Sequence, residues 1–212
     1  MRVPGLFITV EGVEGSGKTT QCRLLVEWLR GQGHRVRETS EPDGSPLGAA
    51  IRAIFELDGL TPLTEALLFT AARQQHVAQV ITPALNAGDI VVSDRYADAT
   101  LAYQGYGRGL DLQTIRELNA LATGGVLPDL TLLLDLDPGV GLERLGGRAR
   151  DAFERLDLAF HRKVRQGYLE LAREEKNRIV VLDAKQPEDR LRGEIRKAVG
   201  DLLRQRGLAR GV

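Results

Sequence analysis

The stretch Leu6-Phe7-Ile8-Thr9-Val10, followed by Gly12-Val13-Glu14-Gly15-Ser16-Gly17-Lys18-Thr19, decides the fold. A short apolar run, a glycine-rich turn, a lysine and a hydroxyl residue are typical of a P-loop, and the pattern over residues 21–30 predicts the helix that follows it. In such a loop, backbone N–H groups surround phosphate oxygens, the lysine contacts the β- and γ-phosphates, and the hydroxyl ligates Mg²⁺. The sequence therefore predicts a nucleoside triphosphate site rather than a glycine-rich turn with an exposed lysine.

Length and charge limit the possible partners. The chain has 212 residues, with 29 Lys plus Arg and 29 Asp plus Glu, so we expect one domain over residues 1–212 and no basic surface for nucleic acid or anionic lipid. A small anionic ligand suits this balance better. The single cysteine, Cys22, cannot form an internal disulfide, and we see no signal-peptide pattern or membrane-length apolar run. These features favour a soluble, cytoplasmic protein without a membrane partner.

Five short apolar runs predict five β-strands. They cover residues 6–10, 36–39, 90–93, 130–134 and 179–182, with longer helical patterns between them. Runs that are apolar on both faces indicate a parallel sheet covered by helices on both sides, which is the doubly wound α/β arrangement. Ligands bind such folds at the carboxyl ends of the strands, where the P-loop, Glu41-Pro42, Asp94-Arg95-Tyr96 and residues 135–138 follow the first four runs.

A long helix is predicted over residues 64–87. Thr64 is the expected cap, and Pro83 is expected to bend or interrupt the helix. Phe69, Arg73 and His76 share one face of it; we read His76 as a packing or surface residue without a catalytic role.

A second segment of interest breaks the helical pattern. Gly146-Gly147-Arg148-Ala149-Arg150 combines glycines with two arginines, which suggests a mobile cationic loop. We expect a lid at about residues 144–155. Arginines that are merely solvated on a surface loop are the alternative.

The other polar motifs distinguish between classes of P-loop protein. Lys176-Asn177-Arg178 does not match the Asn-Lys-x-Asp motif that reads guanine, which argues against a GTPase. Many ATPases end the Walker B strand with Asp-Glu, whereas this chain has Asp94-Arg95. A second cation beside the P-loop suits a second phosphate and favours a small-molecule kinase.

Several ordered motifs resemble those of bacterial thymidylate kinases over nearly the whole chain. They are the P-loop with Glu14, residues 39–42, 68–73, 94–96, 102–105 and 134–138, and the arginine-bearing lid. The resemblance implies a P-loop nucleoside monophosphate kinase fold and Mg²⁺-dependent phosphoryl transfer from ATP to dTMP by a homodimer. It also implies that ATP contacts Gly12, Val13, Glu14, Gly15, Ser16, Gly17, Lys18, Thr19 and Thr20, with Arg144 stacked on adenine.

The expected catalytic residues are cations. The acceptor phosphate is already an anionic nucleophile, so catalysis mainly requires alignment and neutralisation of charge between two polyanions. Lys18 would hold the donor phosphates and Arg95 the acceptor phosphate, while Arg148 and Arg150 would close over the transferring group. Because the P-loop has Gly15 and no arginine, the chain is similar to the lid-arginine subtype of the family.

Thr19 and Asp94 are the expected metal-binding residues. The Thr19 hydroxyl would ligate Mg²⁺, and Asp94 would contact a metal-bound water. A helix cap or an ion pair with a cation near the P-loop is the alternative role for Asp94.

The resemblance also implies how dTMP is bound. Phe69 would stack on thymine, Arg73 would donate to a ring carbonyl, and Thr100 with Gln104 would face the N3–H edge. Phe69 and Arg73 are four residues apart, as are Thr100 and Gln104, so each pair would project from one side of a helix. Phe69 as an ordinary core aromatic is the alternative.

The sugar contacts follow from the same resemblance. Tyr103 would pack under the deoxyribose, Glu14 would meet the 3′-hydroxyl, and Glu41 with Pro42 would border the sugar and base. Ser40 and Asp43 depart from the common family pattern Thr-Arg-Glu-Pro-Gly-Gly, so the acceptor contacts of this loop are open. Rival functions are a deoxynucleoside kinase, in which Asp94 acts as a base on a neutral hydroxyl, and a catalytically idle nucleotide-binding protein.

Overall fold

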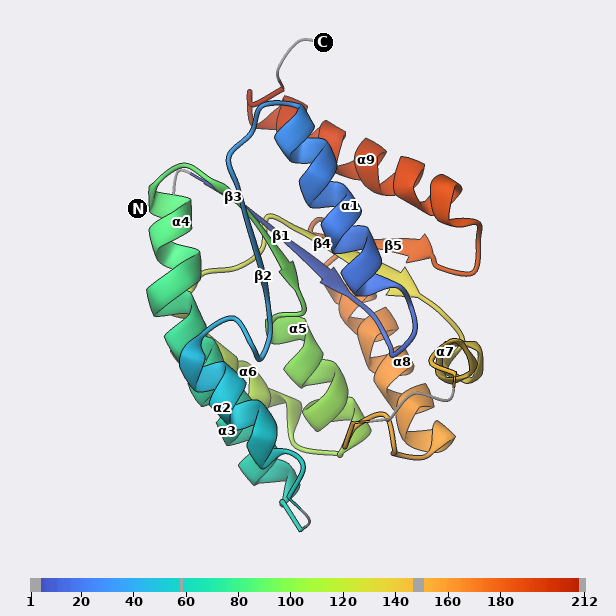
Figure 1. Cartoon of the computed structure of the whole chain (residues 1–212). Helices are drawn as coiled ribbons and strands as arrows, with labels where there is room; N and C mark the ends of the chain where they lie inside the picture. The colour runs from blue at the N-terminus through green and yellow to red at the C-terminus, as the bar shows by residue number, and fades with distance from the viewer. Residues whose placement is uncertain (1–4, 58, 147–150, 210–212) are drawn as a thin grey trace.

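The computed structural model describes residues 5–57, 59–146 and 151–209, and its strands form one parallel sheet in the order β2-β3-β1-β4-β5 (Figure 1). The strands are β1 Leu6–Glu11, β2 Val36–Ser40, β3 Ile90–Asp94, β4 Leu130–Asp135 and β5 Ile179–Asp183. Each ends one residue later than its apolar run, because the last residue of every strand is polar. The predicted five-stranded parallel sheet is confirmed.

Burial differs between the centre and the edges of the sheet. β1 lies between β3 and β4 and is buried along its length, and Thr9 Oγ1 and Thr131 Oγ1 form a hydrogen bond of 2.8 Å between β1 and β4. β2 forms one edge, where Arg37 and Glu38 are exposed. The expectation of strands buried on both faces therefore holds for β1, β3 and β4, whereas the edge strands are partly exposed.

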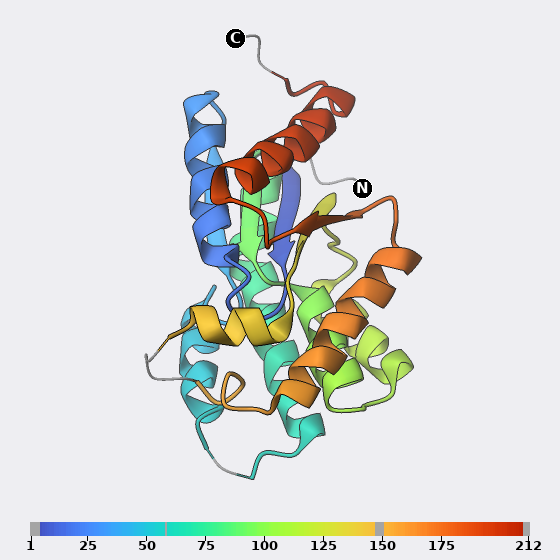
Figure 2. The same cartoon turned by 90° about the vertical axis from the view of Figure 1, so that its right-hand side faces the viewer.

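Helices connect the strands and cover both faces of the sheet (Figures 1 and 2). α1 and α9 lie on one face, with α8 on the opposite face (Figure 2). The helices are α1 Lys18–Gly31, α2 Pro46–Ile54, α3 Pro62–His76, η1 Val77–Ile81, α4 Thr82–Asn86, α5 Ala97–Thr100, η2 Leu101–Gly107, α6 Leu112–Thr123, α7 Pro138–Arg144, α8 Leu158–Glu174 and α9 Glu188–Gln205.

The predicted helix over residues 64–87 is continuous but not uniform. It begins at Pro62 with Thr61 as the cap, whose Oγ1 accepts from the Thr64 N–H, so the prediction of Thr64 as the cap is wrong. η1 is a π-helical segment that lies before Pro83 in α4. Because proline lacks an N–H and crowds the preceding turn, the wider π-helical turns accommodate it without ending the helix.

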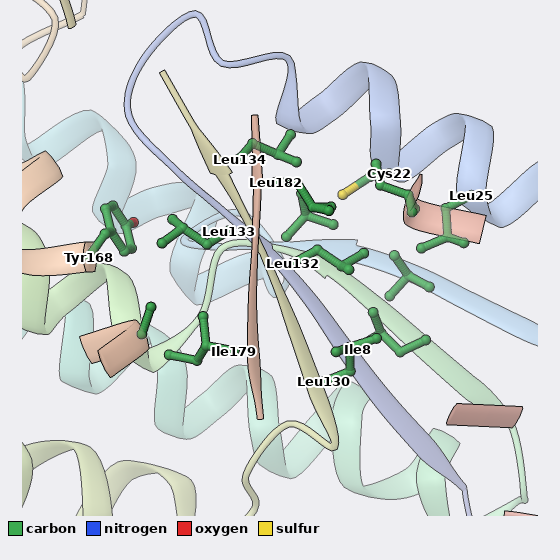
Figure 3. Close-up of a cluster of buried hydrophobic side chains, with 14 of the residues drawn as sticks. Ile8, Cys22, Leu25, Leu130, Leu132, Leu133, Leu134, Tyr168, Ile179 and Leu182 are labelled. Atoms are coloured by element: carbon green, nitrogen blue, oxygen red, sulfur yellow. The ribbon is translucent and has the colours of Figure 1, made fainter. Parts of the chain in front are cut away.

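The main core lies where β4 and its neighbours meet the covering helices (Figure 3). Figure 3 shows Leu132 pointing toward Cys22 and Leu25 of α1, whereas Leu133 points toward Tyr168 of α8. Cys22 is buried as a free thiol, as predicted. Successive side chains of β4 thus bury apolar surface against helices on opposite faces, which is the expected pattern for a covered parallel sheet.

Candidate active site

One cavity of about 590 Å³ lies at the carboxyl edge of the sheet and brings most predicted site residues together. Its lining includes Glu14, Gly15, Gly17, Lys18, Thr19, Thr20, Glu41, Pro42, Phe69, Arg73, Asp94, Arg95, Thr100, Tyr103, Gln104 and Arg144. Gly12, Val13 and Ser16 belong to the same P-loop but do not line the cavity. Arg148 and Arg150 lie outside the described residues.

The P-loop curves tightly because its glycines adopt backbone angles that other residues avoid. Gly12, Gly15 and Gly17 have φ angles of 146°, 69° and 90°. A Cβ atom on Gly15 would lie 2.0 Å from the Gly141 carbonyl oxygen of α7. A side chain at position 15 would therefore require α7 to move, so this P-loop is built for glycine there.

Lys18 is held inside the loop that it follows. Its Nζ donates to the Val13 carbonyl oxygen at 2.9 Å, and the side chain is buried. Burial lowers the pKa of Lys18, as does the nearby Arg95 guanidinium, whereas the Glu14 and Asp94 carboxylates raise it. The ammonium group thus lies where phosphate oxygens would enter the loop.

Thr19 and Asp94 provide adjacent oxygen atoms at the mouth of the P-loop. Thr19 Oγ1 donates to Asp94 Oδ2 at 2.6 Å, and Asp94 is the last residue of β3. Mg²⁺ prefers oxygen ligands and commonly binds one or two protein groups together with water and substrate phosphates. The two residues fit such an ion.

Arg95 has the only positive φ angle of any non-glycine residue in the described part of the chain, at 71°. Its N–H donates to the Val10 carbonyl oxygen at 3.0 Å, and its own carbonyl oxygen accepts from Ser93 Oγ at 2.7 Å. These bonds hold a backbone conformation that is uncommon for a side chain with a Cβ. They direct the guanidinium toward the P-loop.

Glu14 binds that guanidinium. Its Oε1 accepts from Arg95 Nη2 and from the Tyr103 hydroxyl, both at 2.6 Å. Burial alone would raise the pKa of Glu14, but the positive charges of Arg95 and Lys18 lower it to about 2, so the carboxylate is ionised at neutral pH. The residues expected at the acceptor phosphate and sugar therefore contact each other.

Glu11 lies beneath this group as the last residue of β1. Its Oε1 accepts from the Tyr96 N–H at 2.7 Å, and its Oε2 accepts from the Tyr168 hydroxyl at 2.8 Å. Burial and then the Asp98 charge raise the pKa of Glu11 to about 8, against the opposing effect of Arg95. The sequence reasoning missed this residue, although a carboxylate directly before a P-loop is visible in the sequence.

Arg73 is fully buried and closely bound. Its Nε and Nη2 lie 2.9 and 2.7 Å from Glu41 Oε2, its Nη1 donates to Asn119 Oδ1 at 2.8 Å, and its Nη2 donates to the Tyr96 carbonyl oxygen at 3.1 Å. His76 Nδ1 lies 3.2 Å from Glu41 Oε1. His76 is therefore a buried, hydrogen-bonded neighbour of Glu41, and Asn119 is a partner of Arg73 that the sequence reasoning missed.

Phe69 packs within an aromatic cluster that also borders the cavity. Its ring stacks on Phe55 with a centroid distance of 4.3 Å and an interplanar angle of 22°, and the Phe153 centroid lies 5.7 Å away. All three phenylalanines line the cavity. Phe69 thus has core-like contacts and access to a ligand, and Phe55 and Phe153 are lining residues that the motifs did not indicate.

Thr100 and Gln104 both line the cavity, but they lie on different helical segments. Thr100 ends α5, and Gln104 lies in the π-helical η2. The Thr100 Oγ1 is buried and has no hydrogen-bond partner in the described part of the chain. Gln104 Nε2 donates to Glu65 Oε2 at 3.4 Å.

Arg144 and Asp43 have structural partners. Arg144 Nη1 donates to the carbonyl oxygens of Ala184 at 3.1 Å and Gly15 at 3.5 Å, which joins the P-loop to the segment after β5. Asp43 pairs with Arg52 at 2.5 Å, and both line the cavity. The loop that departs from the family pattern therefore adds the Asp43 carboxylate to the cavity wall, where it pairs with an arginine of α2.

Comparison with known proteins identifies the family. The sequence model of thymidylate kinase matches residues 10–195. The chain belongs to the thymidylate kinase family. A thymidylate kinase from Deinococcus radiodurans is 53% identical over 201 residues, covering 93% of this chain and 97% of the relative. One from Desulfovibrio desulfuricans is 48% identical over 213 residues, covering 95% and 98%.

A solved member of the thymidylate kinase family supports the same assignment. The crystal structure of thymidylate kinase from Ehrlichia chaffeensis matches with a TM-score of 0.76 and 36% identity, covering 92% of this chain and 99% of that one. The predicted fold and the expected family of P-loop kinase are thus confirmed. The lid-arginine subtype stays a prediction. No helix within the described ranges has the length and apolar character needed to cross a membrane.

Proposed function

We propose that this protein transfers the γ-phosphoryl group of ATP to dTMP, with Mg²⁺, to give dTDP and ADP. The observation that carries the proposal is the shared cavity: Lys18 of the P-loop and Phe69, Arg73, Arg95 and Thr100 line the same space. A donor phosphate at Lys18 and an acceptor phosphate at Arg95 would meet there end to end, as in-line transfer requires.

On the donor side, residues 12–20 would bind the ATP phosphates and Arg144 would stack on adenine. Thr19 and Asp94 would hold Mg²⁺, which supplies charge neutralisation at the β- and γ-phosphates. Lys18 would exchange its bond to the Val13 carbonyl for phosphate oxygens. Support comes from the buried ammonium group and from the oxygen pair at the loop mouth.

On the acceptor side, Arg95 would bind the dTMP phosphate. Its guanidinium has five N–H donors, so it can keep Glu14 while it binds phosphate oxygens. Glu14 would accept from the 3′-hydroxyl, Tyr103 would pack under the sugar, and Glu41 with Pro42 would border the sugar and base. The low pKa of Glu14, about 2, supports an acceptor role because the ionised carboxylate only accepts.

The base would be recognised by side chains from three helical segments, α3, α5 and η2. Phe69 would stack on thymine, Arg73 would donate to the 4-carbonyl, and Thr100 with Gln104 would face N3–H. The unpartnered Thr100 hydroxyl supports this, because a buried polar atom gains free energy when a ligand supplies its hydrogen bond. Cytosine would place its amino group against the Arg73 donors, which disfavours dCMP.

The lid arginines complete the proposal. Arg148 and Arg150, within a lid at about residues 144–155 of a single-domain chain, would stabilise the charge on the transferring phosphoryl group. Replacing both with alanine should lower kcat about 100-fold or more. Steady-state turnover with saturating ATP and dTMP measures this, and a near-normal kcat would reject the assignment.

The activity is tested by measuring ADP formation with ATP, Mg²⁺ and each of dTMP, dUMP, dCMP, dGMP and dAMP. We expect dTMP to be preferred and dUMP to retain activity, because one missing methyl group costs only about 1–3 kcal/mol. A reaction with thymidine in place of dTMP separates this activity from a deoxynucleoside kinase. Preference for another acceptor, or ADP formation without one, would reject the proposal.

We also propose that the protein works as a homodimer in the cytoplasm. The family resemblance supports the dimer, and the free thiol of Cys22 suits a reducing compartment. Light scattering coupled to gel filtration tests the assembly: a single species at the monomer mass of 23.2 kDa would reject it.

A further inference from the structure

Glu65 lies directly behind a residue that lines the candidate base site. It belongs to the first turn of α3, is 4% exposed and does not line the cavity. Its Oε2 accepts from Gln104 Nε2 at 3.4 Å, and Gln104 does line the cavity. Glu65 therefore has a direct hydrogen bond to a residue that faces the ligand space, although it does not face that space itself.

The Glu65 carboxylate is itself held in place by Arg108, the residue that directly follows η2. Arg108 donates from Nε to Glu65 Oε2 at 3.0 Å and from Nη2 to Oε1 at 2.5 Å. The Arg108 guanidinium also lies 5.2 Å from the Phe160 ring centroid. Because a paired carboxylate accepts hydrogen bonds and a guanidinium only donates them, Glu65 presents a fixed acceptor to Gln104.

A fixed acceptor decides which end of the Gln104 amide faces Glu65. The amide carries an NH₂ donor on one side and a carbonyl oxygen on the other, and either could be turned toward a ligand. Since Glu65 binds the NH₂ group, the carbonyl oxygen is directed away from Glu65. We propose that Glu65 is a positioning residue that turns the Gln104 carbonyl oxygen toward the cavity, where it accepts from the N3–H of a pyrimidine base.

This inference rests on the proposed function and extends it to one step of base selection. N3 of thymine and uracil carries a hydrogen, whereas N3 of cytosine is an acceptor. A carbonyl oxygen at this point favours the first two bases and repels the third. Glu65 therefore adds to the discrimination against dCMP that Arg73 provides at the 4-position, and it does not affect recognition of the thymine methyl group.

Glu65→Ala tests the inference through two selectivity ratios measured on the same variant. Without Glu65 the Gln104 amide can rotate and present its NH₂ group to cytosine N3. We expect the ratio of kcat/KM for dTMP over dCMP to fall about 10-fold, and the ratio for dTMP over dUMP to stay within about 2-fold of the wild-type value. The fall should come mainly from KM. If the alanine variant does not fold, Glu65→Met removes the acceptor at similar volume and carries the same expectation.

Two further variants separate orientation of the amide from general stability. Glu65→Gln keeps an oxygen that can accept from Gln104 but loses the charge that Arg108 binds, so the dTMP-over-dCMP ratio should stay within about 3-fold while Tm falls. Glu170→Ala is the matched control, because Glu170 accepts from Gln166 and Arg173 on the surface of α8. It should change neither ratio.

Three results would overturn the inference. They are an unchanged dTMP-over-dCMP ratio in folded Glu65→Ala or Glu65→Met, an equal loss of both ratios, and a loss in Glu65→Gln as large as in Glu65→Ala. Failure of the proposed function is distinguishable, because the wild-type protein itself would then show no preference for dTMP.

Discussion

The proposed donor and acceptor halves of the cavity are built in different ways. The proposed donor half comes from one continuous stretch, residues 12–20, which covers the loop after β1 and the first residues of α1. Glu14 of this stretch pairs with Arg95 and belongs to the acceptor half. The acceptor half collects side chains from α3, the end of β3, α5 with η2, and the loop after β2. The first depends on local backbone geometry, whereas the second depends on contacts between distant parts of the chain.

Three arginine–glutamate pairs hold the acceptor half together. Arg73 pairs with Glu41, Arg95 with Glu14, and Arg108 with Glu65, and every glutamate of these pairs has a side chain at most 13% exposed. Breaking a buried ion pair leaves one charge uncompensated. We therefore expect changes in the donor half to affect mainly turnover, and changes in the acceptor half to affect stability and acceptor binding together.

Lys18→Met should give the largest effect and confine it to turnover. The loss of the cation at the donor phosphates should lower kcat about 1,000-fold, while Tm stays close to that of the wild type because the methionine chain fills the same space. ADP release and a thermal melt measure the two quantities. Lys197→Met, at an exposed position on α9, is the control. A kcat loss below about 10-fold would place the donor phosphates elsewhere.

Glu41→Ala should affect stability and acceptor binding at once. It leaves Arg73 buried without its carboxylate and removes one of the two hydrogen-bond partners of His76, which should lower the free energy of unfolding by about 3 kcal/mol. Urea unfolding measures this loss. KM for dTMP should rise while KM for ATP stays unchanged. Glu27→Ala, which breaks the exposed pair with Arg23, should cost less than about 1 kcal/mol.

Equal increases in both KM values in Glu41→Ala would contradict the division of the cavity into two halves. A loss of stability as small as that of the Glu27 variant would show that Arg73 finds another partner.

Glu11→Gln should have a more limited effect, a pH-dependent change in the free energy of unfolding. Because the pKa of Glu11 rises from 4.5 to about 8 on folding, the folded state keeps a proton that the unfolded state loses between those values. The stability that this proton provides is full below pH 4.5 and is lost as pH rises through 8. Glutamine stays neutral, so the free energy of unfolding of the variant should gain about 3.5 kcal/mol on that of the wild type between pH 5 and pH 8.

Urea unfolding of the wild type and the Glu11→Gln variant at pH 5 and at pH 8 measures that difference. A difference in unfolding free energy that is the same at both pH values would show that Glu11 does not titrate in this range.

The donor half was predictable from the sequence because its determinants are local. The spacing of Gly12, Gly15, Gly17 and Lys18 specifies the loop, and the apolar runs locate the strands to within one residue at each carboxyl end. The missed residue is polar in each strand, and two of these residues, Ser40 and Asp94, line the cavity. An apolar pattern cannot include it.

The partners in the acceptor half were not predictable in the same way. Asn119 lies 46 positions from Arg73, and Glu65 lies 43 positions from Arg108. No local period connects such pairs, since the fold of α3 against α6 and η2 brings them together. The family motifs indicated Arg73 and Gln104, but the residues that hold them required the structure.

At Arg95, the residue that would give the highest thermal stability differs from the residue that turnover requires. A glycine would adopt the φ angle of 71° without the steric cost that a Cβ imposes, about 1 kcal/mol, yet it would carry no cation for the acceptor phosphate. Arg95→Gly should therefore melt at a higher temperature than Arg95→Ala while both variants lose turnover alike. The cation proposed for the acceptor phosphate thus occupies the one non-glycine position, among the residues described, whose backbone conformation favours glycine.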